Sequence, residues 1–193
     1  MSIAIARSLR TASRAEIRRH IVEGHPVDPT AIEGYAYRGT SLGLPRVVEL
    51  ATWKTFQKTF WRHPDGRLLG WNVRLEQDGI DAPSRPKRKN GAPVVEWPYG
   101  VIGPEGVPMP EGFGRGLVID YSLAPNPPQQ LLVKDPLVAL SAGDFDALLG
   151  VSYLVIAGRT VETPTYFTLE RDHRIDHVPP IDGWDAAARE VSR

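Results

Sequence analysis

The sequence predicts a mainly β fold, an antiparallel barrel with a short N-terminal helix and long loops rich in proline and glycine. Two runs with period-two alternation, 53–62 and 67–76, flank residues 63–66 (HPDG), a turn sequence typical of an antiparallel hairpin. Neither face of the first run is cleanly polar, which suits a barrel wall with packing outside and a partly polar cavity inside. About eight strands follow one another at hairpin spacing, without the alternation of strands and helices that a parallel sheet requires.

The composition limits the classes of protein and partner. At 193 residues, the chain is predicted to form a single β-barrel domain over 1–193. Lys+Arg and Asp+Glu are both 23, so no net charge attracts nucleic acid or an anionic membrane. The absence of cysteine excludes disulfides, thiolate metal sites and a cysteine nucleophile, and it fits a reducing compartment. We therefore expect a cytoplasmic protein that binds no nucleic acid and, because its apolar runs are short, has no membrane span.

Residues 1–30 are predicted to be an N-terminal helical arm. Ser13 and Glu16 have the spacing of a capping box, and Gly24 ends the helical pattern, so we expect a helix at about 14–23 that docks on a barrel end. Two alternatives stay open for this arm, an organelle-targeting leader and a basic binding surface. The basic surface would consist of Arg7, Arg10, Arg14, Arg18 and Arg19.

Residues 79–114 are predicted to be a loop-rich insertion. Segments 94–97 and 99–102 are expected as edge strands, because Pro98 interrupts them and cannot donate to a strand ladder. Segment 103–114 has no periodicity, which is typical of a functional lid or a disordered loop.

The remaining elements follow from alternation and turn residues. A short helix is expected at 44–51, Asp135-Pro136 as a break between strands, and 141–149 as a short turn. The apolar run 151–157 is expected to be a strand buried on both faces and followed by a tight turn. The other strands are expected at 34–39, 115–123, 129–134, 137–140 and 161–170.

Several short motifs resemble the bacterial proteins named for a GXWXG motif. Tyr35 and Tyr37 stand where that motif has its first glycine and its tryptophan. The resemblance implies a lipocalin-like (calycin-type) β-barrel that holds a hydrophobic small molecule or lipid. The matching residues are Tyr37-x-Gly39, Trp53, Lys58-x-Phe60, His63-Pro64 and the segment 163–172.

Lys58 is the candidate for recognition of a ligand's polar end. It alternates with Phe56 and Phe60, so an inward face would bring its ammonium to an anionic or carbonyl head group. A buried ammonium needs a carboxylate, water or ligand beside it, and removing an unpaired one is expected to hold or raise stability. The alternative is an exposed stripe of Lys54, Lys58 and Arg62. The predicted ligand-binding residues are Phe56, Lys58, Phe60, Trp71, Tyr121, Tyr153 and Phe167.

The function predicted first is binding of a hydrophobic small molecule or lipid inside the barrel. The alternative is a cofactor-independent isomerase or cyclase acting on a hydrophobic biosynthetic intermediate, with Lys58, Asp120 and Tyr121 as candidate catalytic groups. No nucleophile elbow, dinucleotide fingerprint, P-loop or metal-binding histidine spacing is present, so we expect neither cofactor nor metal. A protein-interaction role is the third possibility, and the sequence leaves the oligomeric state open.

Overall fold

The computed structural model describes residues 1–43 and 53–181. The helix predicted at 44–51 and the chain after residue 181 lie outside the described residues.

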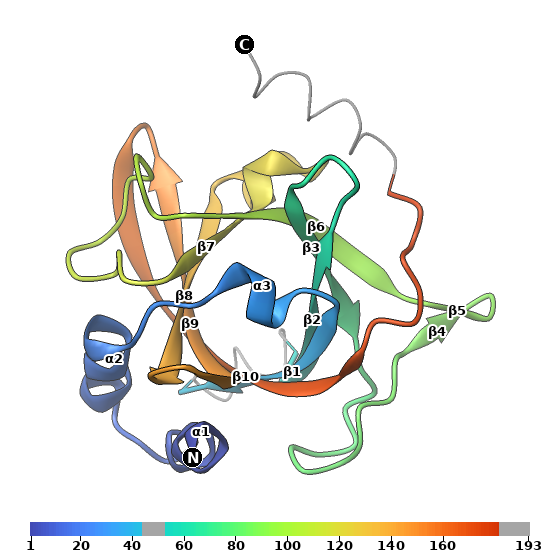
Figure 1. Ribbon diagram of the computed structural model, residues 1–193, viewed down its shortest axis with the longest axis horizontal. Coiled ribbons are helices and arrows are strands. Elements are labelled where there is room, and N and C mark those ends of the chain that lie inside the picture. Colours follow the sequence, from blue (N-terminus) through green and yellow to red (C-terminus); the bar gives the residue numbers. More distant parts are fainter. Residues whose placement is uncertain (44–52, 182–193) are drawn as a thin grey trace.

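Eight strands in the described part of the chain close into an antiparallel barrel (Figure 1). Each strand pairs with the next barrel strand along the chain, and β10 closes the ring by pairing with β1. The predicted fold class, a mainly β antiparallel lipocalin-like barrel, is confirmed. The barrel strands are β1 (Tyr35–Leu42), β2 (Thr55–Arg62), β3 (Leu68–Arg74), β6 (Val95–Ile102), β7 (Leu117–Asp120), β8 (Val133–Ser141), β9 (Asp144–Ile156) and β10 (Arg159–Arg174).

The hairpin of β2 and β3 forms as the sequence predicts, with Gly66 at a φ of 91° in its turn. Its two faces differ as a barrel wall requires. Phe56 and Phe60 belong to the inner core, whereas Leu69 and Trp71 pack in a separate cluster outside the barrel. Alternation along β2 therefore carries Lys58 to the inside.

The predicted edge strands around Pro98 are one continuous strand, β6, which lies between β3 and β7. The loop-rich stretch 79–114 thus contains a barrel strand as well as the small hairpin β4 (Arg88–Lys89) and β5 (Ala92–Pro93). Pro98 is tolerated because the register of β3 and β6 shifts there, and Trp97 has a φ of 49°. A proline at such a bulge removes no ladder hydrogen bond.

The segment after residue 115 departs furthest from the predicted pattern. Strand β7 ends at Asp120, whose carboxylate accepts a hydrogen bond from the Ser122 amide and starts the 3-10 helix η1 (Tyr121–Leu123). Helix α5 (Pro128–Leu131) and a turn residue replace most of the strand expected at 129–134.

Strands β8 and β9 are longer than predicted. Strand β8 runs through Pro136, which is opposite Val118 of β7 and lies in a gap between the β8–β9 pairs Lys134–Tyr153 and Leu137–Gly150. The turn expected at 141–149 covers only residues 142–143, between the end of β8 at Ser141 and the start of β9 at Asp144. The end of β9 is not buried on both faces, because Ile156 is 46% exposed; the tight turn that follows is confirmed.

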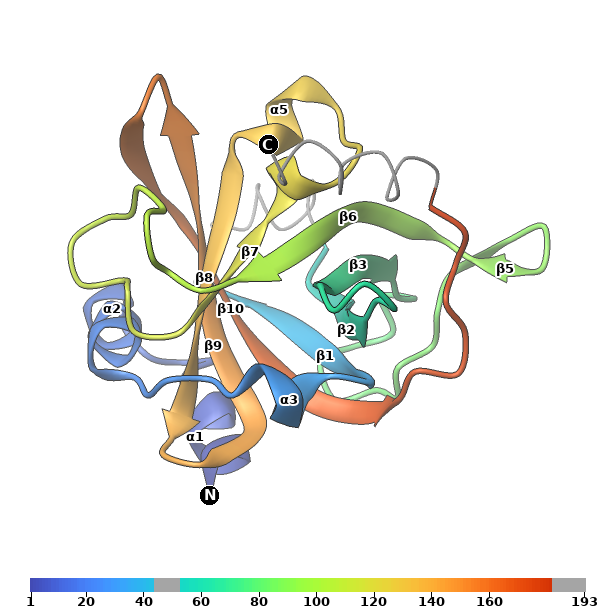
Figure 2. The same cartoon turned by 45° about the horizontal axis from the view of Figure 1, so that its top comes forward.

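Two N-terminal helices pack on the outside of the barrel against β8, β9 and β10 (Figures 1 and 2). Helix α2 (Arg14–Glu23) has the predicted bounds and capping box, whereas α1 (Ser2–Ser8) was not predicted. The prediction that this helix docks on a barrel end is wrong, because Ile17 and Ile21 pack against the outer side of the barrel wall. Several of the basic residues of this arm are paired, as Arg7 and Arg10 are with Glu170.

The short helix α3 (Pro29–Ile32) closes one end of the barrel and lies across the near end in Figure 1. Ile32 is fully buried in the inner core. Arg171 donates to the Ala31 carbonyl over 3.1 Å, and the Tyr37 hydroxyl donates to the Phe145 carbonyl over 2.8 Å. The Arg171 contact holds α3 over the inner core, so this helix covers the barrel interior at this end.

Candidate functional site

A pocket of about 330 Å³ opens at the end of the barrel opposite α3. We call it the open-end pocket. Its walls are the last residues of β1, β3 and β9, the first residues of β2, β6, β8 and β10, and the η1–α5 segment. It is lined by Ser41, Trp53, Phe56, Lys58, Asn72, Trp97, Tyr121, Gln130, Val133, Asp135, Ser152, Leu154, Thr163, Thr165 and Phe167.

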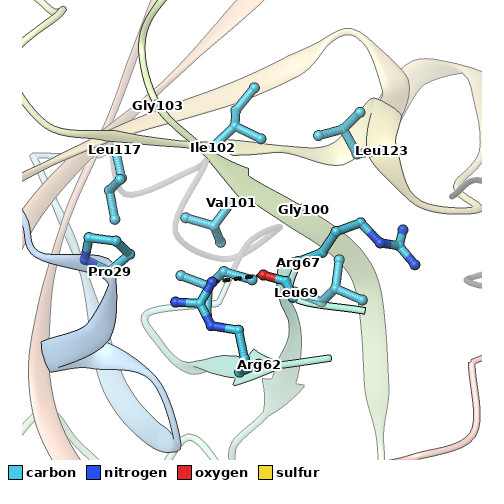
Figure 3. A pocket seen from close by; sticks show the side chains of 12 residues that line it. Pro29, Arg62, Arg67, Leu69, Gly100, Val101, Ile102, Gly103, Leu117 and Leu123 are labelled. Carbon is cyan, nitrogen blue, oxygen red and sulfur yellow. Dashed lines mark hydrogen bonds between the residues drawn. The ribbon is translucent and has the colours of Figure 1, made fainter. Parts of the chain in front are cut away.

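A second cavity, of about 320 Å³, lies near α3 between Pro29, Val101 and Leu117 (Figure 3). Its lining is mainly apolar. The guanidinium of Arg62 at its edge donates to the Gly66 carbonyl over 2.9 Å and to Glu33 over 2.7 Å. Arg67, the other cation of the lining, pairs with Asp65. Because both cations are paired and no uncharged polar side chain among the described residues lines this cavity, the open-end pocket is the stronger candidate site.

Four polar side chains meet inside the open-end pocket, and we call them the polar cluster. The Lys58 ammonium donates to Asn72 Oδ1 over 3.0 Å and to the Tyr121 hydroxyl over 2.6 Å. It lies 3.1 Å from Asp135 Oδ2. The Tyr121 hydroxyl donates to the same carboxylate oxygen over 3.0 Å. Each of the four therefore contacts at least one other member of the cluster directly.

Strand register brings the polar cluster together. Lys58 pairs directly with Asn72 across β2 and β3, so both side chains project from the same face of the sheet. Asp135 pairs with Ile119 across β7 and β8, and Tyr121 follows Ile119 by two residues. Alternation along β2, β3 and β8 thus directs Lys58, Asn72 and Asp135 to one point in the interior, and η1, directly after β7, brings Tyr121 to the same point.

Burial dominates the electrostatics of the polar cluster. Lys58 is 2% exposed, and its ammonium lies 5.0 to 5.3 Å from the ring centres of Tyr99, Tyr121 and Phe167. Desolvation lowers the pKa of Lys58, and the nearby Asp135 opposes that shift. Desolvation also raises the pKa of Tyr121, with Asp135 acting in the same direction. Tyr121 is therefore a neutral hydrogen-bond donor at neutral pH.

Asp135 lines the pocket and has an unused acceptor atom. Its side chain is 2% exposed, and Oδ2 receives the contacts of Lys58 and Tyr121. Oδ1 is buried and has no hydrogen-bond partner among the described residues. Because a buried carboxylate oxygen strongly favours a donor, this atom marks a place where a ligand or water can bind.

Two tryptophans stack at the mouth of the pocket. The rings of Trp53 and Trp97 are 4.8 Å apart and nearly parallel, and the guanidinium of Arg74 lies 5.0 Å from the Trp53 ring centre. The Ser41 hydroxyl donates to the Trp53 carbonyl over 2.8 Å and holds this segment against β1. The mouth therefore offers flat apolar surface next to the polar interior.

The structure brings together four of the predicted ligand-binding residues. Phe56, Lys58, Tyr121 and Phe167 line the open-end pocket, and the exposed-stripe alternative for Lys58 is wrong. Phe60 faces inward but lies deeper, packed edge-on against the Tyr37 ring at 5.4 Å.

Three other predicted residues lie outside the pocket. Trp71 packs with Leu69 on the outer side of the wall, because β3 places Asn72 inside. Tyr153 also points outward, and its hydroxyl donates to the Pro108 carbonyl over 2.7 Å. Asp120 is buried but forms an ion pair with Lys134, away from the polar cluster.

Sequence reasoning missed Asn72, Trp97 and Asp135 as parts of the site. A usable signal for Asp135 was present, because a charged residue interrupts the otherwise apolar face formed by Val133 and Leu137. Nothing comparable marks Asn72, whose inward direction depends on the register of β3.

Comparison with known proteins supplies no family: no family model matches the chain, and no curated protein matches it. Over residues 1–43 and 53–181, no helix has the length and apolar character needed to cross a bilayer. Within the same ranges, no group of three or more histidine and acidic side chains is arranged to hold a metal ion. The fold and the site define an antiparallel barrel with a polar cluster at the base of an open apolar pocket.

The buried tyrosines predict a steep loss of stability at alkaline pH. Burial raises the pKa of Tyr37, Tyr99, Tyr121, Tyr153 and Tyr166 above the ordinary value of 10.0. The folded state then holds these protons more tightly than the unfolded state, so stability falls as the pH rises above about 10. The lowered pKa of Lys58 makes stability rise with pH instead, but this effect ends at the ordinary lysine pKa of 10.5.

Ultraviolet absorbance of the phenolate, followed together with circular dichroism, checks this expectation. Phenolate should develop steeply in the same transition in which the β signal is lost. A gradual titration of most tyrosines around pH 10 in a folded barrel would contradict it.

Proposed function

We propose that this protein binds a hydrophobic small molecule or lipid in the open-end pocket, with the ligand's polar end at the polar cluster. The observation that carries the proposal is a charged, desolvated cluster beneath the apolar walls formed by Phe56, Phe167 and Leu154. Ligand pockets typically combine such walls with a few converging polar groups in a volume of about 300–1,000 Å³. The resemblance to the GXWXG-motif proteins supports the same proposal, and the absence of cysteine favours a cytoplasmic setting.

Binding is tested by titrating the protein with a panel of apolar compounds, since Trp53 and Trp97 lie at the mouth and their fluorescence should change. Thr165→Phe places a ring in the pocket and should weaken binding about tenfold or more. Val161→Phe is the matched control, because Val161 lies on the same strand, is 46% exposed and does not line the pocket.

The proposal fails if no compound in the panel changes the fluorescence and native mass spectrometry of protein from its own host finds no bound molecule. It also fails if the two phenylalanine variants weaken binding equally.

A second candidate function is favoured by the free Oδ1 of Asp135. This carboxylate oxygen could act as a base and move a proton within a bound molecule, while Tyr121 and Lys58 hold the carboxylate in place through its other oxygen. This corresponds to the isomerase or cyclase class, with Asp135 in the place predicted for Asp120. Incubation of a bound compound in deuterated water distinguishes the two functions, because an isomerase introduces deuterium at carbon and a binding protein returns the compound unchanged.

A further inference from the structure

The open-end pocket has a balanced charge, which bears on the head group it accepts. Lys58 and Asp135 are the charged residues that line it within the described part of the chain, and they contact each other at 3.1 Å. A ligand carboxylate at this point would place a second negative charge beside Asp135 in a desolvated site. Like charges at such a distance strongly disfavour each other.

The ammonium of Lys58 has no free donor for an anion. An ammonium carries three N–H groups. Its three oxygen neighbours in the polar cluster are Asn72 Oδ1 at 3.0 Å, the Tyr121 hydroxyl at 2.6 Å and Asp135 Oδ2 at 3.1 Å. A carboxylate could bind Lys58 only by displacing one of these partners.

The polar cluster has a free hydrogen-bond acceptor. Asp135 Oδ1 is buried and unpartnered among the described residues, while Oδ2 is engaged twice. A group that fits this atom must donate a hydrogen bond and carry no negative charge. A hydroxyl meets both conditions. A carboxylate meets neither, and an ester is uncharged but cannot donate.

We infer that the pocket selects a neutral apolar alcohol, aliphatic or aromatic, whose hydroxyl donates to Asp135 Oδ1 while its hydrocarbon part packs against Phe56, Phe167 and the Trp53–Trp97 stack. The inference rests on the proposed binding function and names its ligand class. A neutral hydroxyl thus takes the place of the anionic head group that Lys58, considered without Asp135, led us to expect. Asp135 sets the specificity, and Lys58 holds that carboxylate in place.

Three probes of equal chain length test the inference on the unmodified protein: 1-decanol, decanoate and decyl methyl ether. The alcohol should bind about tenfold or more tightly than the other two, since only its head can donate without adding charge. Binding is measured by tryptophan fluorescence and calorimetry at neutral pH. Because this comparison uses no variant, the stability of a mutant does not affect it.

Asp135→Asn provides the second arm. The variant removes the negative charge and offers an amide in place of the carboxylate, so the preference should reverse: decanol weakens about tenfold and decanoate strengthens. Asp120→Asn is the matched control, because Asp120 is also buried but pairs with Lys134 outside the pocket. That control should keep the order of the unmodified protein, and affinity for the ether verifies an intact pocket in both variants.

Each other result overturns a stated claim. If decanoate binds as tightly as decanol or better, the inference fails and the proposed binding function stands. If decanol and the ether bind alike, water satisfies Asp135 and the inference fails. If none of the three probes binds, the inference fails. The proposed binding function is then decided separately, by the titration with the wider panel of apolar compounds.

Discussion

Lys58→Met is expected to lower the free energy of unfolding by about 3–5 kcal/mol, the cost of leaving one member of a buried ion pair without its partner. Asp135 would remain 2% exposed with its counter-charge gone. Asn72 and Tyr121 would each lose a donor as well. The earlier expectation, that removing an unpaired ammonium holds or raises stability, is reversed because the structure pairs Lys58 with Asp135.

Urea unfolding of two further variants identifies the cause. Lys58→Met combined with Asp135→Leu removes both charges and should recover stability to within about 1 kcal/mol of the unmodified protein, because a buried ion pair and an apolar pair are often nearly equivalent. Lys89→Met, at an exposed position, should change stability by less than about 0.5 kcal/mol. A single-variant loss below about 1 kcal/mol would show that the pair is not desolvated as described.

Gly70→Ala is expected to destabilise the barrel by about 3 kcal/mol, at the upper end of the usual cost of overpacking. A Cβ at Gly70 would overlap the Thr59 carbonyl oxygen and the ring of Tyr99. That ring crosses from β6 over β3, and its hydroxyl donates to the same Thr59 carbonyl over 2.8 Å. Backbone on one side and a fully buried ring on the other leave little room for relaxation.

Gly114→Ala is the matched control for this substitution. A Cβ there would lie 3.6 Å from the end of the Met109 side chain, an ordinary contact. Its thermal midpoint should stay close to that of the unmodified protein, or rise slightly because alanine restricts the unfolded chain. Equal effects of the two alanines would mean that the close packing at Gly70 is not what limits stability.

Local patterns in the sequence were sufficient to predict the general architecture of the barrel. The hairpin around residues 63–66 and the capping box at Ser13 are short-range features, and both form as predicted. Alternation also placed Lys58 on the same face as Phe56 and Phe60. It could not show that this face points inward, because direction depends on how all the strands close.

The misplaced residues have physical reasons. Pro98 and Pro136 look like strand breakers in sequence, yet each lies where the ladder has a gap or a shift in register. That misreading removed Asp135 from consideration. Trp71 was assigned to the interior because it is aromatic, but its neighbour Asn72 takes that place, and aromatic character does not distinguish the two faces of a barrel wall.

Closure of the ring by its first and last strands has a consequence for how the chain acquires its structure. Tyr35 pairs with Arg174 and Leu42 with Tyr166, so this seam cannot form completely until residue 174 has left the ribosome. Until then β1 and β9 both present unpaired edges, which are templates for association with other chains. Contacts so distant in sequence also make folding slow. The nascent chain therefore needs protection during synthesis more than the finished barrel does.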